Sequence, residues 1–381
     1  MSHPARDLTK RVKVEAKQNG FDFIGVTTPD PPLHIDVYTQ WLDRGRHGEM
    51  AYLSTERALQ RRSDPKLILP ECKSILVLAT NYLPNRIEEQ QPGSARIASY
   101  ALGEDYHDTL VQRMKPIVEF IEREMGTPVA HKLYTDTGPI LERELAQRAG
   151  LGWIGKNTCL ILPSAGSNFL LSEILLGIEL EIDTPFPYDM CGKCRRCIDA
   201  CPTDCILPDR TLEARRCISY LTIELKNAIP VDLRQSTGNW IFGCDICQQV
   251  CPWNLRFAKP TTDPAFQPRQ YLEKPDIKSF LELTPEAFQI NFAGSPLKRS
   301  KRRGILRNAS VAAGNCGDLN YLNNLEKLMH HDPESLIRSH AAWAIGKLGG
   351  PKAKTILQEA ISLEKDPDTL KEIQKALHGL M

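Results

Sequence analysis

Nine of the twelve cysteines in this 381-residue chain lie between positions 191 and 251. A chain of this length can bury a sizeable core, so it does not need cysteines to cross-link a small fold. Structural thiols scattered through a fold would not gather in so short a segment. In a reducing compartment such clustering indicates metal or redox chemistry.

The spacing of these cysteines is more specific than their number. Residues 191–202 read C-x2-C-x2-C-x3-C-P, and residues 244–252 read C-x2-C-x3-C-P. The first is the bacterial ferredoxin spacing, in which the fourth cysteine ligates the other of two 4Fe–4S clusters. Cys217 can supply the thiolate missing from the second run. We therefore predict one cluster on Cys191, Cys194, Cys197 and Cys251, and another on Cys201, Cys217, Cys244 and Cys247.

Zinc is the alternative, because C-x2-C pairs are also common zinc ligands. Two runs that both end in Cys-Pro favour iron–sulfur clusters instead. Cys205 is not needed once the eight ligands are assigned. We expect it to be a small buried residue, and we expect the same of Cys72, Cys159 and Cys316. Two adjacent clusters would relay electrons without identifying a substrate.

Charge and hydropathy exclude two classes of protein. Lys and Arg total 48 against 47 Asp and Glu, a net charge of +1, so any nucleic-acid binding must use a local patch. No apolar run reaches the roughly 18 residues of a membrane helix, and the N-terminus starts no apolar signal core. We expect a cytoplasmic protein that does not contact membranes.

Residue patterns predict three consecutive domains. Helical patterns over 6–19 and 107–125 alternate with strand patterns over 21–26, 74–80 and 128–134, which is typical of an α/β or α+β domain. A Pro-rich stretch before residue 186 and four prolines in 259–276 mark junctions. The predicted domains are 1–185, 186–258 with the cysteines, and 259–381.

The C-terminal part contains a weak repeat. Small residues recur 32 positions apart, with Ala309, Ala312 and Gly314 matched by Ala341, Ala344 and Gly346. This period predicts HEAT-like helical pairs, too few to form a free solenoid and therefore docked on the rest of the chain. A plain helical tail with chance similarity is the alternative.

A basic segment precedes the first repeat. It comprises Lys298, Arg299, Lys301, Arg302 and Arg303, with Arg307 shortly after and no acid among them. Such a patch can contact the phosphates of a nucleic acid in a salt-dependent way. It can also be simply the solvated start of a helix.

Further motifs accompany the cysteine runs and the repeat: Tyr134–Gly138, Glu142-Arg143, Arg148–Asn157, Arg216–Thr222 and Gly243–Asp245. Taken together, these motifs resemble the epoxyqueuosine reductase family over nearly the whole chain. The resemblance implies a cobalamin-binding N-terminal domain, a ferredoxin-like domain with two clusters, and HEAT-like repeats. It also implies an oxidoreductase that reduces epoxyqueuosine to queuosine in tRNA, the last step of queuosine biosynthesis. Electrons would pass from an external donor through the clusters to base-off cobalamin.

Cobalamin itself is implied only by this resemblance. The cobalt-ligating motif D-x-H-x-x-G is absent, because residues 105–110 lack its glycine. That agrees with cobalamin held without a histidine ligand. By the resemblance the corrin lies near Arg62, Asp136, Leu160, Leu171, Ser219, Gly243, Cys244, Asp245 and Ile246. For Leu160 and Leu171, core packing is the alternative.

The resemblance makes Asp136 the proton donor to the opening epoxide. An ordinary aspartate has a pKa of about 3.9, so the role needs burial or a negative neighbour to raise that pKa. Alternatively, Asp136 only marks a helix start near Gly138-Pro139.

Contacts with tRNA are predicted for Arg143, Lys156, Thr222 and the basic residues Lys298, Arg299, Lys301, Arg302 and Arg303. A surface salt bridge for Arg143 and a solvated side chain for Lys156 are the alternatives. The chain is expected to act as a monomer. Two other functions stay open: a cobalamin-dependent enzyme like the reductive dehalogenases, and a non-catalytic iron–sulfur module that passes electrons to a partner.

Overall fold

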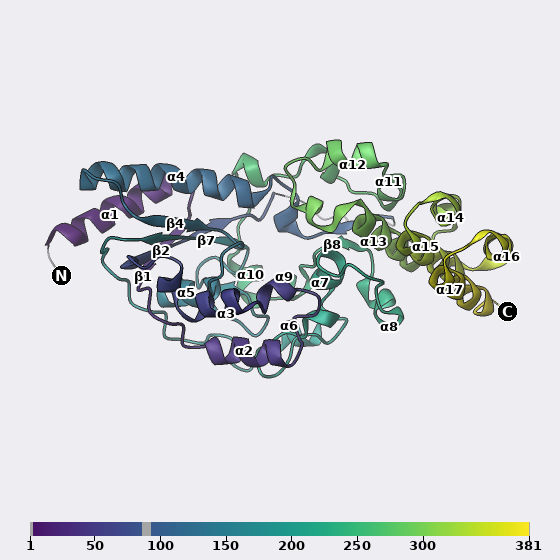
Figure 1. Ribbon diagram of the computed structural model, residues 1–381, viewed down its shortest axis with the longest axis horizontal. Coiled ribbons are helices and arrows are strands. Elements are labelled where there is room, and N and C mark those ends of the chain that lie inside the picture. The colour runs from purple at the N-terminus through teal and green to yellow at the C-terminus, as the bar shows by residue number, and fades with distance from the viewer. Residues whose placement is uncertain (1–2, 86–92, 381) are drawn as a thin grey trace. The chain divides into compact units, whose positions relative to one another are not determined.

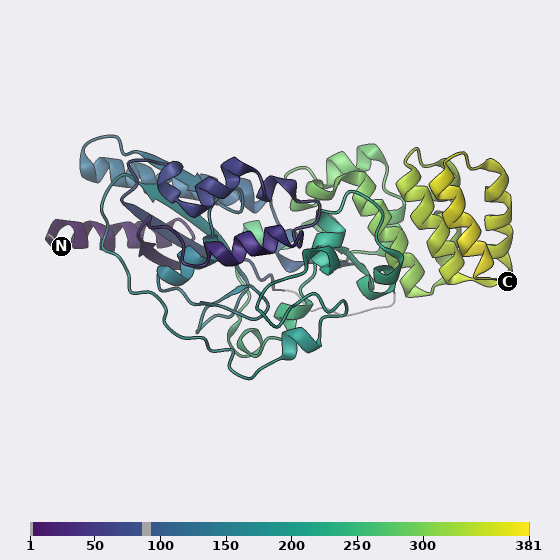
Figure 2. The same ribbon diagram turned by 60° about the horizontal axis from the view of Figure 1, so that its bottom comes forward.

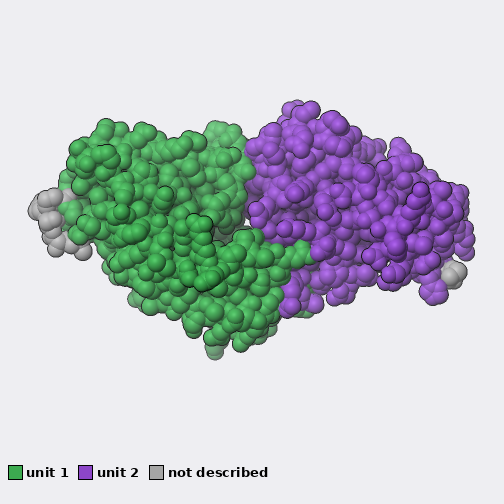
Figure 3. All heavy atoms as spheres, in the orientation of Figure 1, with its two compact units in different colours: residues 1–85, 104–214, 246–267 green, residues 86–103, 215–245, 268–381 purple. Residues whose placement is uncertain are grey.

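The computed structural model describes residues 3–85 and 93–380, and the chain folds into two compact units (Figure 3). Unit 1 contains residues 1–85, 104–214 and 246–267, and unit 2 contains residues 86–103, 215–245 and 268–381. Both units are discontinuous in sequence, and the cysteine-rich segment contributes to each. The three consecutive domains stay a prediction.

Unit 1 is built on a four-stranded sheet with the strand order β1-β2-β7-β4. Every neighbouring pair is antiparallel, so of the two predicted classes the unit is α+β. The strand patterns near 21–26, 74–80 and 128–134 are confirmed, and β2 is the buried central strand that its apolar run predicts. The fourth strand, β7, has no counterpart in the sequence analysis. The strands are β1 (Phe23–Thr27), β2 (Ser74–Asn81), β4 (His131–Tyr134) and β7 (Phe169–Leu176).

Helices cover both faces of this sheet. The long helices α1 (His3–Gln18) and α4 (Tyr106–Met125) lie on one face, and the short α5 (Glu142–Arg148) lies on the other (Figure 1). Gly25 allows α5 to approach closely, since a Cβ there would lie 2.2 Å from the Ala149 carbonyl oxygen. Unit 1 also contains α2 (Ile35–Asp43), α3 (Glu56–Ser63), α6 (Arg196–Asp199), α9 (Ile246–Gln249), α10 (Pro252–Phe257) and the hairpin of β5 (Trp153–Ile154) and β6 (Leu160–Ile161).

Unit 2 is mainly helical. Its short parallel pair, β3 and β8, packs with α13, and α13, α15 and α17 then pack one against the next (Figure 2). The predicted helical pairs are present, while the described part of 259–276 forms only 3-10 turns and loop. The elements are β3 (Arg96–Ile97), β8 (Trp240–Phe242), α7 (Ile218–Ile223), α8 (Val231–Arg234), α11 (Ile277–Leu281), α12 (Pro285–Asn291), α13 (Lys301–Cys316), α14 (Leu322–His331), α15 (Ser335–Leu348), α16 (Gly350–Leu363) and α17 (Pro367–His378).

Two buried polar side chains dock α13 on the rest of unit 2. Arg307 is 1% exposed and donates to the backbone carbonyls of Leu221, Leu225 and Asn227. The Asn308 amide donates to two further backbone carbonyls, each at 2.8 Å. Because buried carbonyls need donors, these bonds tie the first repeat to the chain around α7. Arg307 is therefore structural and is not part of a surface patch.

The repeated glycines mark the closest helix contacts. A Cβ on Gly314 would lie 3.0 Å from Ala344 Cα, and one on Gly346 would lie 2.7 Å from Ala376 Cβ. The 32-residue spacing seen in the sequence is thus the spacing of equivalent contacts in successive helical pairs. Within the described residues, no helix combines the length and apolarity needed to cross a bilayer.

We expect Gly346→Val to destabilise the helical repeats by about 1–3 kcal/mol, because the added atoms overpack a closed contact. Valine is a better helix former than glycine, so a loss must come from packing. Thermal unfolding by circular dichroism measures the effect. Gln374→Val, at an exposed position of α17, is the control and should change the midpoint little. An unchanged midpoint for Gly346→Val would contradict the close contact.

Candidate active site and iron–sulfur centres

The first predicted cluster set comes together within unit 1. Cys191 and Cys194 lie on the loop that enters α6, Cys197 lies in α6 itself, and Cys251 lies immediately before α10. Burial, followed by the charges of the neighbouring thiols, raises the pKa of Cys197 and of Cys251. These mutual charge effects mean that the four thiols lie near one another, as the four ligands of one cluster must. This donor set fits a 4Fe–4S cluster.

Neighbouring elements hold the cysteine loop in shape. Gly192 adopts a φ of 50°, which suits glycine, and the Cys194 N–H donates to the Cys191 carbonyl at 3.0 Å. Lys156 Nζ donates to the carbonyls of Gly192 at 2.6 Å and Cys194 at 2.9 Å. Trp153 Nε1 lies 3.5 Å from Cys191 Sγ. Lys156, predicted to contact tRNA, is therefore engaged in supporting this loop.

The second predicted set is divided between the units. Cys201 and Cys247 belong to unit 1, and Cys217 and Cys244 belong to unit 2. Cys205 is 3% exposed, as expected, and its Sγ lies 3.4 Å from Cys201 Sγ. A hydrogen bond from Cys205 is the main cause that lowers the pKa of Cys201 to about 5. Cys205 is therefore a neighbour of a predicted ligand as well as a buried residue.

The remaining cysteines and the zinc alternative are also tested by the geometry. Cys72 is buried as expected, but Cys159 and Cys316 are only partly buried. The described residues contain no group of three or more His, Cys, Asp or Glu side chains arranged to hold one metal ion.

Asp136 lies in the turn that follows β4, with a φ of 54°. Its Oδ2 accepts a hydrogen bond from the Tyr106 hydroxyl at 2.6 Å and lies 3.8 Å from His107 Nε2. The other ring nitrogen of His107, Nδ1, lies 2.7 Å from Asp105 Oδ1. The Asp136 side chain is 64% exposed, so a substrate could reach its carboxyl.

The helix-start explanation of Asp136 is wrong. The nearest helix, α5, begins at Glu142, and its N-cap residue Leu141 makes no side-chain cap. The Asp136 carboxyl instead faces the first residues of α4. The turn at this point brings an aspartate to two proton-bearing groups, a tyrosine and a histidine.

The pKa of Asp136 is lowered, not raised as its predicted role requires. Partial desolvation alone would raise it, but hydrogen bonds from His107 and Tyr106 and the charges of His107 and Arg143 outweigh that effect. Burial alone would lower the pKa of His107, but its contacts with Asp105 and Asp136 raise it to about 9. At neutral pH Asp136 is thus ionised, and the proton beside it resides on His107.

Two glutamates lie behind this turn, Glu142 partly buried and Glu173 fully buried. Glu142 Oε1 accepts a hydrogen bond from the Asp136 backbone N–H at 2.6 Å. Glu173, in β7, is fully buried, and its oxygens have no partner of ordinary hydrogen-bond geometry among the described residues, although its carboxyl faces that of Glu142. Burial and then the charge of Asp136 raise the pKa of Glu142 to about 8. Burial and the charge of Glu142 raise that of Glu173 well above its usual value.

The sequence analysis missed four of these groups: Tyr106, His107, Glu142 and Glu173. A signal existed for two of them. Glu173 is an acid inside the chain's longest mostly apolar stretch, where an unpaired charge is costly. His107 follows Asp105 by two residues, a spacing considered above only as part of a cobalt motif.

The predicted corrin residues of unit 1 include core positions. Leu160 belongs to the hydrophobic core under the sheet, and Leu171 packs against that core. Arg62 is 9% exposed, and its guanidinium lies 5.4 Å from the centre of the Tyr38 ring. Asp136 is the solvent-open member of this group.

The predicted corrin residues of unit 2 lie on α7 and on the loop after β8. Gly243 has a φ of 68°, and a Cβ there would lie 2.5 Å from Ala98 Cβ, so glycine is required. Asp245 is buried and accepts from the Ser99 N–H at 2.7 Å. Ser219 and Cys244 are partly exposed. Ile246, the next predicted corrin residue along the chain, belongs to unit 1 and is also partly exposed.

Two observations in unit 1 fit cobalamin. Both ring nitrogens of His107 face carboxylates, which agrees with a cobalt that takes no ligand from this histidine. Asn157 Nδ2 is buried without a hydrogen-bond partner among the described residues. An orphan donor of this kind calls for an acceptor, and the amide side groups of a corrin supply acceptors.

Some side chains predicted to contact tRNA already have hydrogen-bond partners within the protein, and others are exposed to solvent. Thr222 is fully buried, and its hydroxyl donates to Ile218 O and accepts from the Gly243 N–H. The structure therefore does not support its contact with RNA. The Arg143 guanidinium donates a hydrogen bond to the Thr158 carbonyl. Among the described residues it forms no surface salt bridge, which was the alternative to a contact with tRNA.

Most of the basic segment is paired with acids. Arg302 lies 2.7 Å from the buried Asp332 carboxyl and also donates to Leu283 O. Arg299 pairs with Glu224, and Arg303 lies 3.7 Å from Glu334. Lys298 and Lys301 are exposed. The charge available to an RNA phosphate is thus smaller than the sequence suggests and is greatest at these two lysines.

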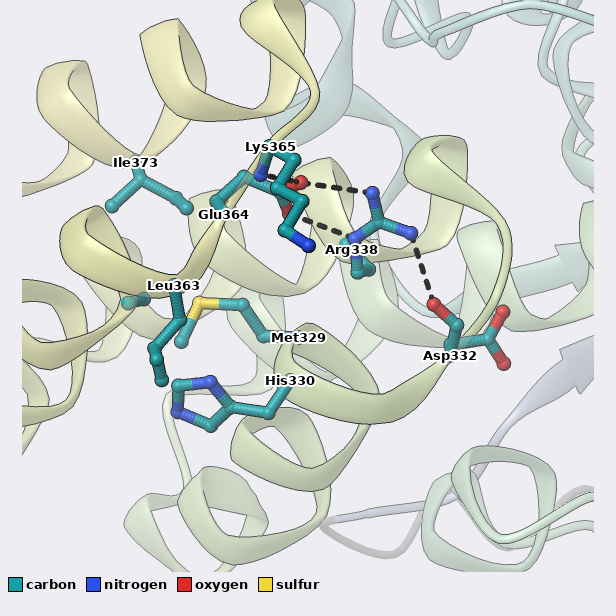
Figure 4. Close-up of a pocket in the computed structure, with 9 residues that line it drawn as sticks. Met329, His330, Asp332, Arg338, Leu363, Glu364, Lys365 and Ile373 are labelled. Atoms are coloured by element: carbon teal, nitrogen blue, oxygen red, sulfur yellow. Dashed lines mark hydrogen bonds and ion pairs between the residues drawn. The ribbon is translucent and has the colours of Figure 1, made fainter.

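A cavity of about 200 Å³ lies among the C-terminal helices (Figure 4). Arg338 lines this cavity, but its guanidinium already donates to the Glu364 carboxylate at 2.7 Å and to the Asp332 carbonyl at 3.0 Å. The cavity contains no predicted site residue. Its lining is Met329, His330, Asp332, Arg338, Ala360, Leu363, Glu364, Lys365 and Ile373.

Family models match three parts of the chain. Residues 62–137 match the model for epoxyqueuosine reductase QueG. Residues 190–254 match a 4Fe–4S double cluster binding domain, and residues 297–378 match HEAT repeats. The cysteine segment and the C-terminal helices are therefore of the predicted kinds.

Whole-chain comparisons agree with these matches. An epoxyqueuosine reductase of Pseudomonas aeruginosa is 38% identical over 91% of this chain and 96% of its own. A solved epoxyqueuosine reductase bound to an epoxyqueuosine-modified tRNA-Tyr stem loop has a TM-score of 0.90 at 33% identity, covering 98% of this chain and 99% of its own. A Bacillus subtilis relative, solved with its aspartate catalytic loop swung out of the active site, has a TM-score of 0.88 at 33% identity, with the same coverage.

We expect Cys197→Ser to lower the iron content of the reconstituted protein from about eight to about four per chain, because one cube loses a ligand. Cys205→Ser should keep about eight, because Cys205 is a neighbour and not a ligand. Iron and sulfide analysis with electron paramagnetic resonance measures both. Loss of four irons from Cys205→Ser would make Cys205 a ligand and contradict the assignment.

Proposed function

The chain belongs to the epoxyqueuosine reductase family, and we propose that it reduces epoxyqueuosine to queuosine in tRNA, drawing electrons from an external donor. The observation that carries the proposal is the solvent-open Asp136 backed by His107, in the unit that also assembles the first cysteine set. Epoxide reduction needs a proton source and an electron relay together. A tRNA substrate also implies a cytoplasmic site of action.

The reaction fixes what the protein must supply. Removing the epoxide oxygen as water and leaving a carbon–carbon double bond consumes two electrons and two protons. When bound, cobalamin would reduce the epoxide with electrons delivered through the two clusters. Arg62, Asp136, Leu160, Leu171, Ser219, Gly243, Cys244, Asp245 and Ile246 would hold it.

The chain's own residues deliver one of the two protons, and solvent water supplies the other. Because Asp136 is ionised at neutral pH, it acts as a relay and His107 as the store. A proton on His107 Nε2 passes to Asp136 Oδ2 and then to the epoxide oxygen. The Tyr106 hydroxyl, 2.6 Å from the same carboxyl oxygen, keeps that oxygen oriented. The aspartate catalytic loop of the Bacillus subtilis relative supports Asp136 in this role.

Lys298 and Lys301 are the best candidates for contacts with the RNA backbone. Both are exposed at the start of the helical repeats, whereas their arginine neighbours are paired with acids. Arg143 and the basic arginines would add smaller contributions, since their ion pairs would have to open. The relative that binds a modified stem loop supports a tRNA partner.

We expect Asp136→Asn to keep its clusters and cobalamin but to lose about 10²–10⁴-fold in turnover, because the proton relay is broken. The assay is anaerobic: reconstituted protein, cobalamin and a strong reductant meet tRNA carrying epoxyqueuosine, and mass spectrometry follows loss of one oxygen. Asp108→Asn, an exposed carboxylate in the first turn of α4, is the control and should stay active.

Full turnover by Asp136→Asn would remove its role in proton transfer. The wild-type protein tests the proposed function itself. No conversion, with both clusters intact and cobalamin bound, would point to another cobalamin-dependent reduction. No binding of cobalamin at all would favour the electron-transfer module.

We expect the double change Lys298→Glu and Lys301→Glu to weaken tRNA binding. The slope of log affinity against log salt should fall by about 1 for each lost phosphate contact. Lys354→Glu with Lys375→Glu changes the charge equally at exposed positions of α16 and α17 and is the control. Filter binding at several salt concentrations measures both. Equal slopes for the two variants would return the lysines to a solvated surface.

A further inference from the structure

We propose that a shallow hollow formed by α6, α9 and α10 is the docking surface for the electron donor, a small acidic protein that carries a flavin with its apolar ring edge exposed. The inference rests on the proposed function in one respect, that electrons come from an external donor. It adds the place where that donor binds and the chemistry that it presents. The hollow has a volume of about 520 Å³ and lies entirely in unit 1, where it is lined by Arg196, Asp199, Ala200, Gln249, Val250 and Leu255.

The hollow lies on the two stretches of chain that connect one predicted cluster to the other. In and after α6, three residues separate Cys197, a ligand of the first cluster, from Cys201, a ligand of the second. In and after α9, three residues likewise separate Cys247 of the second cluster from Cys251 of the first. The two helices pack against each other, and five of the six lining residues are at most two positions from one of these cysteines. A donor bound in the hollow would therefore lie near both clusters, and electron transfer is fastest over short distances.

Leu255 is the main apolar group of this surface, and the folding of α10 leaves it exposed. Trp253 packs edge-on against Trp153, with 4.9 Å between the ring centres. Asn254 is buried and exchanges hydrogen bonds with Ser167. Because these two residues face inward, Leu255 is left 67% exposed. With the alanine and valine of the lining it forms an apolar surface of the kind that marks interaction sites, and the dimethylbenzene edge of a flavin is an apolar group that suits it.

Basic side chains surround this apolar surface. Residues 191–201 and 246–259 contain five basic side chains and one acid, in a chain whose net charge is only +1. That acid, Asp199, lies 3.3 Å from Arg195. A local excess of positive charge attracts an acidic partner and orients it before contact. The thiolate ligands of the clusters also carry negative charge, so a test has to separate docking from the balancing of that charge. The five basic residues, all exposed, are Lys193, Arg195, Arg196, Arg256 and Lys259.

The electron transfer at this surface is balanced without a proton. The anionic, fully reduced flavin of the donor gives one electron to an oxidised cluster and is left as its neutral radical, while the cluster gains that electron. Two such encounters supply the two electrons that removal of the epoxide oxygen consumes. Transient electron-transfer complexes bury little surface, which agrees with a shallow hollow surrounded by charges.

Flavodoxin, a small acidic protein that carries FMN, is the probe for this surface in the full chain with both clusters reconstituted. Calorimetry measures the affinity for oxidised flavodoxin, and stopped-flow absorbance measures the rate at which reduced flavodoxin reduces the clusters. We expect Leu255→Gln to weaken binding by about 10-fold or more, because it removes an apolar contact without changing the charge. Leu363→Gln changes a comparably exposed leucine of α16, 65% against 67%, and is the control that should bind as wild type.

Dithionite, a small reductant that needs no docking surface, separates docking from an effect on the clusters. It should reduce the clusters of the wild type and of Leu255→Gln at the same rate, and their reduction potentials should be equal. The rate with flavodoxin should fall as salt rises. Arg256→Glu should lower that rate at low salt and flatten its salt dependence, whereas Lys354→Glu, at an exposed position of α16, should not.

Three results would overturn the docking surface. They are equal affinity of wild type and Leu255→Gln for flavodoxin, no binding of flavodoxin to the wild type, and slower reduction of Leu255→Gln by dithionite. Weaker binding of tRNA to Leu255→Gln, with unchanged binding of flavodoxin, would assign the surface to RNA instead. Because these measurements with flavodoxin need neither tRNA nor cobalamin, the docking surface can stand while the reductase assay fails, and the two failures are distinguishable.

Discussion

The pairing of β7 with both β2 and β4 is the interaction on which the candidate active site depends. It places Glu173 in the centre of the sheet, behind the turn that leaves β4 and next to the start of α5. The apolar residues that follow Glu173 in β7, Ile174 to Leu176, are buried with it. The site therefore takes its position from the sheet of unit 1, and its exposed member, Asp136, is bonded through its backbone N–H to Glu142, which lies in front of the buried Glu173.

In this site the neighbours of a carboxyl group, and not the residue type, determine whether its pKa is raised or lowered. Three carboxyls lie close together, yet hydrogen bonds from His107 and Tyr106 lower the pKa of Asp136, while burial raises the pKa of Glu142 and of Glu173. The basic segment follows the same rule. Its arginines are mostly satisfied by acids, and Arg302 compensates the buried Asp332. A count of charged residues along the chain does not reveal which of them remain available to a substrate.

The sequence predicts what short-range spacing encodes. The cysteine runs, the strand patterns of β1 and β2 and the 32-residue glycine repeat all correspond to features of the structure, because each depends on residues close in sequence or on equivalent contacts. Contacts between residues that are distant in sequence could not be predicted from these patterns. Glu142 reaches back to Asp136, Arg302 finds Asp332, and Thr222 is buried under α13 by Asn308. The lowered pKa of Asp136 also follows from such contacts, which spacing cannot reveal.

The support of the cysteine loop by Lys156 and Trp153 has a consequence for assembly. Cys191 and Cys194 are presented on a loop that hydrogen bonds already shape, and Cys197 follows in α6, so inserting a cluster there orders little new chain. The fourth thiol, Cys251, lies 60 positions beyond Cys191. A cube bound to all four would close that long chain segment as a cross-link does, limiting the freedom of the unfolded chain. Oxidative loss of this cluster would therefore loosen the fold around it as well as interrupt the electron path.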